Sequence, residues 1–401
     1  MKQGMKWGVI VALAILSPSL VPAQRPVPAV RAALTAQNSL AIARENETIE
    51  LPWTVVLAHM PGASPARVRI VDEVGSEVVS QLIDADANGT PELLIFQSSF
   101  WPSERKQFFL EGVASAAKPV SRVHVMHDAP RDDVAWESDR IAFRIYGEGL
   151  KKTSSAMSSS GIDIWVKSVR TPVLEKWYGK GHDSYHVDTG EGADYFDVGE
   201  SLGVGGTALW RGDSLYRADN FQTYKITADG PIRASFELRY NPWSAGDLTV
   251  SEVKRFSIDA GQNLYRQESV FSSNKPGDIT YAIGLVKRAG MTATESKAQA
   301  WGWLSGWGTI DPKNGGHGEL GTAVLLPRQR IVDWKETPTH YIAISHATPG
   351  QPVVHYIGGG WTATASGDFQ DPQSWWRYLD RFSTRLASPV VITWGTQNAA
   401  R

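Results

Sequence analysis

Two histidines, three tyrosines and four acidic residues crowd one glycine-rich stretch of the 401-residue chain, residues 177–195. Its glycines permit backbone conformations with positive φ, which let a ligand approach closely. If residues 182–188 form a strand, His182, His186 and Asp188 share one face, because side chains alternate along a strand. In a helix His182, Tyr185 and His186 would converge instead, but the flanking glycines argue against a helix. Histidine titrates near neutral pH, and a neighbouring carboxylate can fix its tautomer. The pattern therefore predicts general acid–base catalysis.

The same three residues would also suit a metal ion. His182, His186 and Asp188 could ligate a divalent metal through two imidazole nitrogens and a carboxylate oxygen. A third interpretation is a polar surface loop whose side chains hydrogen-bond to one another. Loops often carry function, which favours catalysis over this last interpretation. We expect a catalytic site without a cofactor, with metal binding as the alternative.

Cations that could hold an anionic substrate lie within this stretch and after it. Arginine matches a carboxylate with two parallel N–H groups, and Arg233 stands in an alternating apolar segment. Ideal alternation puts Tyr185 opposite the histidines, so a catalytic tyrosine here requires a bulge. The expected catalytic group combines a base (His182 or His186), an acid (Tyr185) and a carboxylate clamp (Arg233 or Lys180).

Further residues could bind a sugar around this centre. The 16 tryptophans exceed what a core of this size requires, and indole rings stack on the flat apolar faces of sugars. The run 301–308 spaces three of them with glycines. The expected substrate-binding residues are Asp188, Glu191, Asp194, Trp303 and His346. Glu191 with an aspartate would also suit a glycoside hydrolase.

Composition narrows the classes of function. The absence of cysteine rules out disulfides, thiolate metal sites and cysteine nucleophiles. A formal net charge of −2 gives no indication of nucleic acid or an anionic membrane as a partner. Residues 1–23 have a basic start, a short apolar run and small residues before Gln24, which is typical of a secretory signal peptide. We expect a periplasmic or secreted protein without membrane insertion after cleavage.

Short strands punctuated by Gly, Asn and Asp dominate the remaining chain. A disordered start is expected over residues 24–34, a small N-terminal β domain over 35–118, and a large β domain with the active site over 119–401. The predicted fold class is all-β, with a large antiparallel β-supersandwich preceded by a smaller β-sandwich-like domain. In the large domain, Ile141, Phe143 and Ile145 are predicted to share one strand face.

Two local patterns allow sharper expectations. Asp371 followed by Pro372 predicts the start of a helix, with the aspartate as its N-cap. Residues 84–89 resemble the front half of a calcium loop, but Ile95 stands where an EF-hand needs its glutamate. Because Asn-Gly alone explains a tight connection, we predict a hairpin turn there.

Four segments carry a family resemblance: WESDRIAFR (136–144), GIDIW (161–165), HVDTGEGAD (186–194) and DGPIR (229–233). They resemble a family of exported bacterial proteins long catalogued only as a domain of unknown function. Proteins of that family are found among enzymes that degrade pectin, rhamnogalacturonan and ulvan. The resemblance covers roughly residues 35–395. It implies a glycan-related role and a supersandwich similar to galactose-mutarotase-like domains.

Together these features predict a carbohydrate-active enzyme that cleaves uronic-acid-containing oligosaccharides or polysaccharides by β-elimination, as a lyase or dehydratase. A base would remove the proton next to the carboxylate, and an acid would assist departure of the C4 substituent. The cationic clamp would stabilise the enolate-like intermediate. The alternatives are a glycoside hydrolase on pectic or ulvan oligosaccharides and a non-catalytic glycan-binding or mutarotase-like module.

Overall fold

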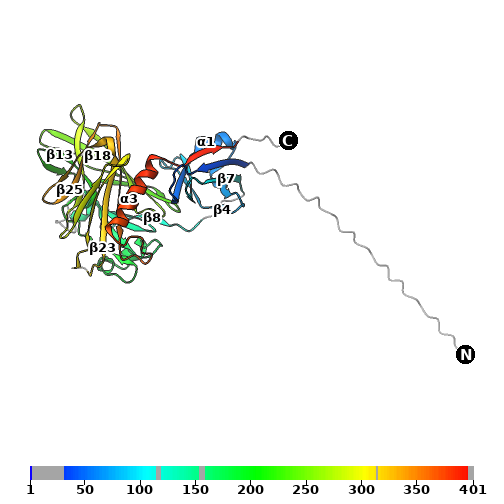
Figure 1. The fold of residues 1–401 in the computed structure, drawn as a ribbon, viewed down its shortest axis with the longest axis horizontal. Helices are drawn as coiled ribbons and strands as arrows, with labels where there is room; N and C mark the ends of the chain where they lie inside the picture. The colour runs from blue at the N-terminus through cyan, green and yellow to red at the C-terminus, as the bar shows by residue number, and fades with distance from the viewer. Residues whose placement is uncertain (2–30, 114–118, 153–158, 313–314, 396–401) are drawn as a thin grey trace.

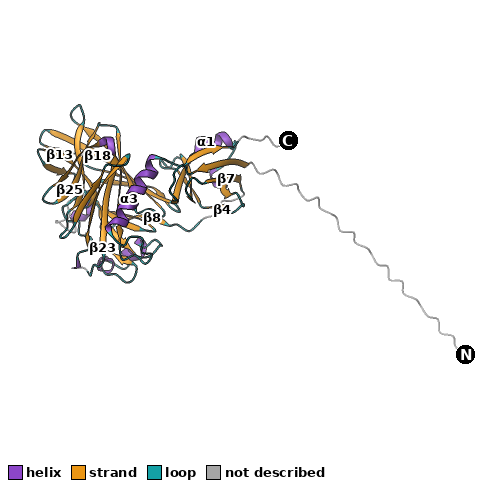
Figure 2. Cartoon of the chain, in the orientation of Figure 1, coloured by secondary structure: helices purple, strands orange, loops and turns teal. Residues whose placement is uncertain are grey.

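The computed structural model describes residues 1, 31–113, 119–152, 159–312 and 315–395. The expected signal peptide lies outside these residues apart from Met1, and the first described strand begins at Arg31. Figure 1 shows a small lobe that holds β1, α1 and β7 beside a larger lobe that holds the remaining sheets. Strands make up most of both lobes (Figure 2).

The small lobe contains two antiparallel sheets and one short helix. Its first sheet has the order β27 (Val391–Trp394), β1 (Arg31–Gln37), β7 (Arg105–Gly112), β3 (Val68–Asp72), β4 (Glu77–Val78). Its second sheet has the order β2 (Arg44–Pro52), β6 (Leu93–Phe100), β5 (Ser80–Ile83). The helices are α1 (Trp53–His59) and the 3₁₀ turn η1 (Pro65–Arg67). Alternating apolar residues of both sheets form one core between them.

The last strand of the chain belongs to this first lobe. β27 pairs antiparallel with β1, and Leu34 lies opposite Trp394. The indole of Trp394 stacks on the imidazole of His59, with ring centroids 4.4 Å apart. The expected domain range of 35–118 therefore lacks one strand, β27, which comes from roughly 270 residues further along the chain. In Figure 1 this red strand lies beside the blue β1.

Three antiparallel sheets build the large lobe. The nine-stranded large sheet has the order β15 (Thr223–Asp229), β16 (Arg233–Arg239), β18 (Leu248–Asp259), β19 (Leu264–Ser273), β26 (Pro352–Trp361), β23 (Glu319–Pro327), β22 (Trp301–Thr309), β21 (Thr292–Ser296), with β17 (Trp243–Ala245) on β18. The site sheet has the order β12 (Gly192–Ala193), β11 (Asp163–Lys167), β10 (Ile141–Tyr146), β9 (Asp133–Ser138), β8 (Val123–Asp128). The third sheet has the order β14 (Ser214–Arg217), β13 (Val204–Arg211), β20 (Ile279–Val286), β25 (His340–Ala347), β24 (Ile331–Glu336). The helices of this lobe are α2 (Leu174–Gly179), α3 (Pro372–Ala387), η2 (Glu148–Lys152), η3 (His182–His186) and η5 (Arg328–Arg330).

The site sheet and the third sheet pack on the large sheet through one shared core. Trp136 of β9 is at its centre, with ring centroids 4.9, 5.2 and 5.3 Å from Phe236, Phe256 and Tyr265 of the large sheet. Ile141, Phe143 and Ile145 join this core, so their predicted shared face is confirmed. The predicted fold class, a large antiparallel β-supersandwich with a smaller sandwich before it, is confirmed as well.

Helix α3 covers the outer face of the large sheet. Asp371 caps it as predicted, because the Asp371 carboxylate accepts from the backbone N–H of Ser374 at 2.6 Å. Trp375, Leu379 and Phe382 follow at helical spacing and are buried against β22 and β23. Within the described part of the chain, no helix has the length and apolar character needed to span a membrane.

Candidate active site

The segment of residues 168–194 covers the outer face of the site sheet. Glu137 of β9 anchors it, because its Oε1 accepts from the backbone N–H groups of Val173 and Leu174 at 2.8 and 2.9 Å. The other carboxylate oxygen of Glu137 accepts from the ammonium of Lys167, and both side chains are fully buried. α2 therefore begins on the sheet, and the histidine stretch follows it directly.

The expected strand over residues 182–188 is wrong, because none of these residues forms a strand. Residues 182–186 form the 3₁₀ helix η3, and Gly181 enters it with φ of 93°. The Ser184 hydroxyl closes this turn by donating to the Gly181 carbonyl at 2.7 Å. A positive φ favours glycine, and a polar side chain that bonds to the backbone competes with strand pairing. Helical spacing therefore replaces alternation here.

This helical spacing brings the two imidazoles together. The ring centroids of His182 and His186 lie 4.9 Å apart, and Tyr185 lies 5.4 and 4.8 Å from them. The side chain of His182 is 59% exposed and that of His186 is 29% exposed. Tyr185 is buried and stacks on Trp165 of the site sheet at 4.7 Å. The tyrosine thus lies beneath the histidine pair.

Hydrogen bonding defines the tautomer of His186. Its Nδ1 lies 3.1 Å from the backbone carbonyl of Asp194, which can only accept, so Nδ1 carries the proton. Nε2 then keeps its lone pair and can accept a proton. Burial lowers the pKa of His186, and the nearby charges of Arg144 and His182 lower it further. The ring is therefore neutral at neutral pH and suited to act as a base.

A buried ion network lies beneath the two histidines. Arg144 of β10 donates through Nη2 to Asp163 at 2.7 Å and to Asp194 at 3.0 Å. Its Nη1 donates to the Tyr185 hydroxyl at 3.0 Å. Asp163 and Asp194 are almost fully buried. Because desolvated ion pairs hold fixed geometry, Arg144 couples the sheet to the histidine segment at two points.

Asp133 is the unusual carboxylate of this network. Burial raises its pKa to about 7, against the lowering effect of Arg144. Its Oδ1 accepts from the Tyr178 hydroxyl at 3.2 Å, while no described residue hydrogen-bonds to its Oδ2. A perturbed carboxyl of this kind is common at functional sites.

Arg131 supplies a cation at the rim of this cluster. Its guanidinium carbon lies 5.5 and 5.8 Å from the ring centroids of Tyr178 and Tyr185, and its side chain is 21% exposed. Asp128 pairs with it at 2.9 Å. Sequence reasoning assigned no role to Arg131, Arg144 or Asp133, because only the folded sheet brings them under the 168–194 segment.

Arg233, an expected carboxylate clamp, is held elsewhere. Its guanidinium pairs with Asp259 at 2.6 Å and with Glu50 of the small lobe at 2.7 Å. These two carboxylates neutralise its charge at the junction of the lobes. Lys180, the other expected clamp, is exposed at the end of α2.

The expected substrate-binding residues separate into several locations. Trp303 is buried under α3 and donates from Nε1 to Asp380 at 2.8 Å, so α3 covers its indole. His346 is exposed on β25 of the third sheet and lies 3.2 Å from the Thr280 hydroxyl. Asp194 belongs to the buried network. Glu191 accepts from Lys176 at 2.6 Å.

Asp188 turns toward a different histidine. Its Oδ1 accepts from the backbone N–H groups of Gly190 and Gly192 at 2.7 and 3.0 Å. Its Oδ2 lies 3.8 Å from Nε2 of His317. The expected metal ligands His182, His186 and Asp188 therefore do not converge on one point in this structure.

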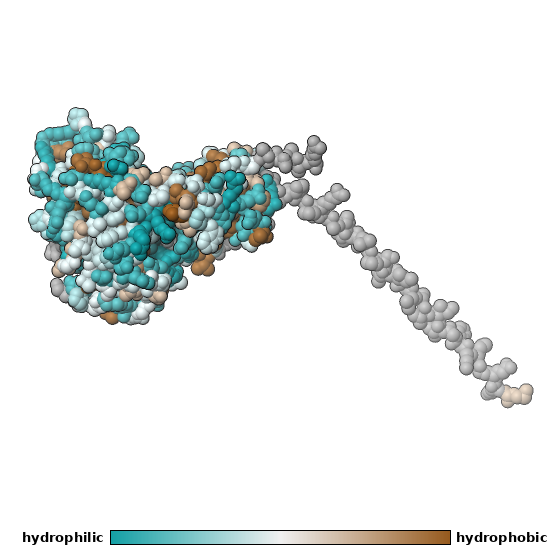
Figure 3. All heavy atoms as spheres, viewed as in Figure 1, coloured by the Kyte–Doolittle hydropathy of each residue, from teal (hydrophilic) through white to brown (hydrophobic). Residues whose placement is uncertain are grey.

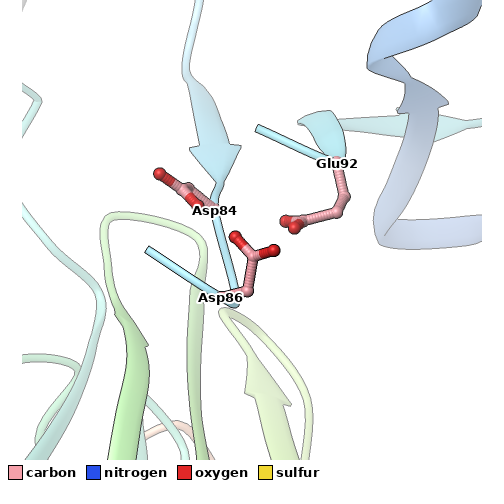
Figure 4. A group of neighbouring side chains, drawn as sticks. All are labelled: Asp84, Asp86 and Glu92. Atoms are coloured by element: carbon pink, nitrogen blue, oxygen red, sulfur yellow. The ribbon is translucent and has the colours of Figure 1, made fainter. Parts of the chain in front are cut away.

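A different acidic group has the spacing of a metal site. Among the residues that the structure describes, the ligand atoms of Asp84, Asp86 and Glu92 lie within 4.8 Å of one another (Figure 4). They lie in the loop that joins β5 to β6, and these two strands pair antiparallel as the predicted hairpin requires. Glu92 also accepts from the Ala85 N–H at 2.8 Å. These carboxylates could hold a cation.

The sequence has relatives that match nearly its whole length. Residues 36–392 match the family described as "Domain of unknown function (DUF4861)". The "Uncharacterized protein P7" of Formosa agariphila is 32% identical over 379 residues, which cover 90% of this chain and 92% of that protein.

Solved structures share the fold at low sequence identity. An alpha-mannosidase from Enterococcus faecalis aligns with a TM-score of 0.52 and 10% identity over 94% of this chain and 47% of that one. A protein in the glycosyl hydrolase family 38 from the same organism aligns with a TM-score of 0.52 and 10% identity, over 92% and 48%. The chain thus spans about half the length of these two proteins, and the likeness concerns the fold.

The family resemblance expected from the four sequence segments is thereby confirmed, while its association with pectin and ulvan stays a prediction. The match over residues 36–392 and the full-length relative show that this chain belongs to the DUF4861 family.

Proposed function

We propose that this protein is a carbohydrate-active enzyme that cleaves uronic-acid-containing oligosaccharides by β-elimination, as a lyase or dehydratase. The observation that carries the proposal is the histidine pair held above Tyr185 and Arg144. One ring, that of His186, is neutral and has an unprotonated Nε2. The other, His182, lies 4.9 Å away and is more exposed. β-Elimination requires a base for the proton at C5 and a proton donor for the oxygen that leaves C4.

In the proposed reaction, Nε2 of His186 takes the proton from C5, next to the carboxylate. The electrons of that C–H bond form the C4–C5 double bond as the C4–O bond breaks. Protonated His182 gives its proton to the departing oxygen, which leaves as an alcohol in a lyase or as water in a dehydratase. Arg131 at the rim pairs with the carboxylate and stabilises the enolate-like charge.

Tyr185 takes a positioning role in this scheme. The residue is 2% exposed, and its hydroxyl accepts from Arg144, so its ring supports the histidines from below. The role of acid, which the sequence suggested for Tyr185, passes to the exposed His182. Arg131 takes the role of clamp in place of Arg233 or Lys180.

The family and the fold support a glycan substrate. The related solved structures are described as a mannosidase and a glycosyl hydrolase family 38 protein, and the fold is all that this chain shares with them. Pectin, rhamnogalacturonan and ulvan fragments are our proposed substrates because they contain uronic acids. We further propose that the protein acts in the periplasm or outside the cell.

The test follows the double bond that elimination creates. The purified protein is incubated with uronic oligosaccharides from pectin, rhamnogalacturonan and ulvan, and the absorbance of unsaturated uronate is recorded. Turnover by the parent protein and its loss in His186→Ala are expected. His346→Ala is the matched control, because His346 lies on the third sheet and its loss should leave turnover intact.

Three results would overturn the proposal. New reducing ends without the unsaturated chromophore would indicate a glycoside hydrolase. Retarded migration in glycan gels without turnover would indicate a binding module. Unchanged turnover in His186→Ala would remove His186 from the reaction.

A further inference from the structure

A polar groove opens where the small lobe, the large sheet and α3 meet. Its volume is about 350 Å³, within the range of ligand sites, and such sites favour domain interfaces. β2 contributes one wall, β16, β18 and β19 contribute another, and the end of α3 closes it. Figure 3 shows hydrophilic residues gathered on the surface where the two lobes join.

The charges that line this groove cancel. Three carboxylates and three guanidinium groups line it: Glu47, Glu50, Asp259, Arg233, Arg266 and Arg385. Most are already paired, with Arg233 2.7 Å from Glu50 and Arg385 2.7 Å from Glu47. An anionic ligand would meet a carboxylate beside each guanidinium, and a cationic ligand would meet a guanidinium beside each carboxylate. The groove therefore favours a neutral ligand.

The groove offers hydrogen-bond donors and acceptors side by side. Guanidinium groups only donate and carboxylates only accept, whereas a sugar hydroxyl does both. Neighbouring Arg–carboxylate pairs thus match a row of hydroxyl groups. The hydroxyl of Ser257 adds a further partner on the same wall.

Aromatic rings provide an apolar surface in the same groove. Tyr356 and Phe382 both line it, with ring centroids 5.2 Å apart. The C–H faces of a sugar ring pack on such surfaces. Polar pairs, a zero charge balance and aromatic walls together suit a neutral carbohydrate.

We infer that this groove is a binding site for a neutral oligosaccharide, separate from the histidine pair. The two sites call for different ligands, since the histidine site is proposed for uronates. The occupant would contact both lobes at once, because Glu47 and Glu50 come from β2 and Ser257 and Arg266 come from the large sheet. Binding would consequently hold the lobes together and stabilise the protein.

The test measures binding of neutral glycans by isothermal titration calorimetry on the full chain. The probes are cello-, xylo-, manno- and galacto-oligosaccharides, with oligogalacturonate as the charged comparison. Ser257→Trp fills the groove without removing any charge. Ser251→Trp is the matched control, because Ser251 is a half-buried serine of the same strand outside the groove. Arg266→Ala, which removes a half-exposed groove wall, provides a second variant.

At least one neutral probe should bind and raise the melting temperature. Its affinity should depend little on ionic strength. Ser257→Trp should weaken the affinity for that probe about ten-fold or more, and Arg266→Ala should weaken it measurably. Ser251→Trp should bind like the parent. Binding of none of the neutral probes, a preference for oligogalacturonate, or equal binding by Ser257→Trp and Ser251→Trp would overturn the inference. Turnover of uronates at the histidine pair is measured separately, so its presence or absence does not affect the conclusion about binding in the groove.

Discussion

Nη2 of Arg144 donates to Oδ2 of Asp194 at 3.0 Å, and this contact joins the site sheet to the histidine segment. The backbone carbonyl of the same aspartate accepts from Nδ1 of His186 at 3.1 Å. One buried arginine therefore fixes the residue that fixes the tautomer of the proposed base. Support of this kind, one layer behind the reacting groups, determines how accurately a site is held.

Loss of Arg144 should destabilise the protein strongly. Arg144→Met leaves Asp163 and Asp194 buried without their cation, and breaking a buried pair costs about 3–5 kcal/mol. Denaturant unfolding followed by tryptophan fluorescence measures the free energy. Arg239→Ala is the control, since its exposed pair with Glu237 should contribute about 1 kcal/mol or less. Equal losses in the two variants would contradict the structural role of Arg144.

Asp133 should make stability fall as the pH rises. Its pKa is about 7 in the folded protein against an ordinary value of 3.8, so the folded state holds a proton that the unfolded state releases. By linkage, the free energy of unfolding decreases as the pH rises from 3.8 to about 7, by up to about 4 kcal/mol. Asp133→Asn, which cannot ionise, should remove this decrease and be the more stable protein at pH 7.

The comparison uses free energies of unfolding at several pH values between 4 and 7. Asp72→Asn serves as control, because this carboxylate lies in an exposed turn of the small lobe. Parallel curves for Asp133→Asn and the parent would show that Asp133 is ionised in the folded state.

Alternation and capping predicted much of the scaffold but little of the site. Ile141, Phe143 and Ile145 face the core as their spacing indicated, and Asp371 caps its helix. The other face of the same strand carries Arg144, and alternation along the strand predicts a solvent-exposed side chain there. Its burial depends on a segment some 40 residues later, and local pattern contains no information on that contact.

The prediction of a strand at the histidine stretch, residues 182–188, was wrong for a local reason. Gly181 with φ of 93° starts a 3₁₀ turn, in which positions three and four apart converge. A strand was expected because the flanking glycines argued against a helix. Likewise, the pairing of β27 with β1 joins the two ends of the chain, and a sequence pattern cannot specify such a partner.

The C-terminal strand should be required for a stable small lobe. A stop after Pro389 removes β27, which leaves the β1 edge unpaired and His59 without the Trp394 ring. Faster amide hydrogen exchange in β1 and earlier proteolysis of the small lobe are expected. A stop after Gly395 retains β27 and should behave like the parent. Unchanged protection of β1 in the shorter protein would contradict the pairing.

The cap of α3 should contribute a modest stability. Asp371→Ala removes the carboxylate that accepts from Ser374 and should cost about 1 kcal/mol. Asp371→Asn keeps a side-chain acceptor and should restore most of that loss. Thermal unfolding of the three proteins measures the difference, and an alanine variant as stable as the parent would show that packing on β22 and β23 alone sets the helix start.

The imidazole of His186 should titrate below the ordinary histidine pKa of 6.5, because burial and the charges of Arg144 and His182 all oppose its protonation. NMR titration of the histidine side chains measures this without any substrate. In His182→Gln one of those charges is gone, so the pKa of His186 should rise toward 6.5. A lowered pKa keeps Nε2 free to accept a proton at neutral pH, and loss of activity on acidification should follow this same titration. An unshifted His186 in the parent, or one indifferent to His182, would mean that the two rings do not act on each other, and the proposed division into base and proton donor would have no physical basis.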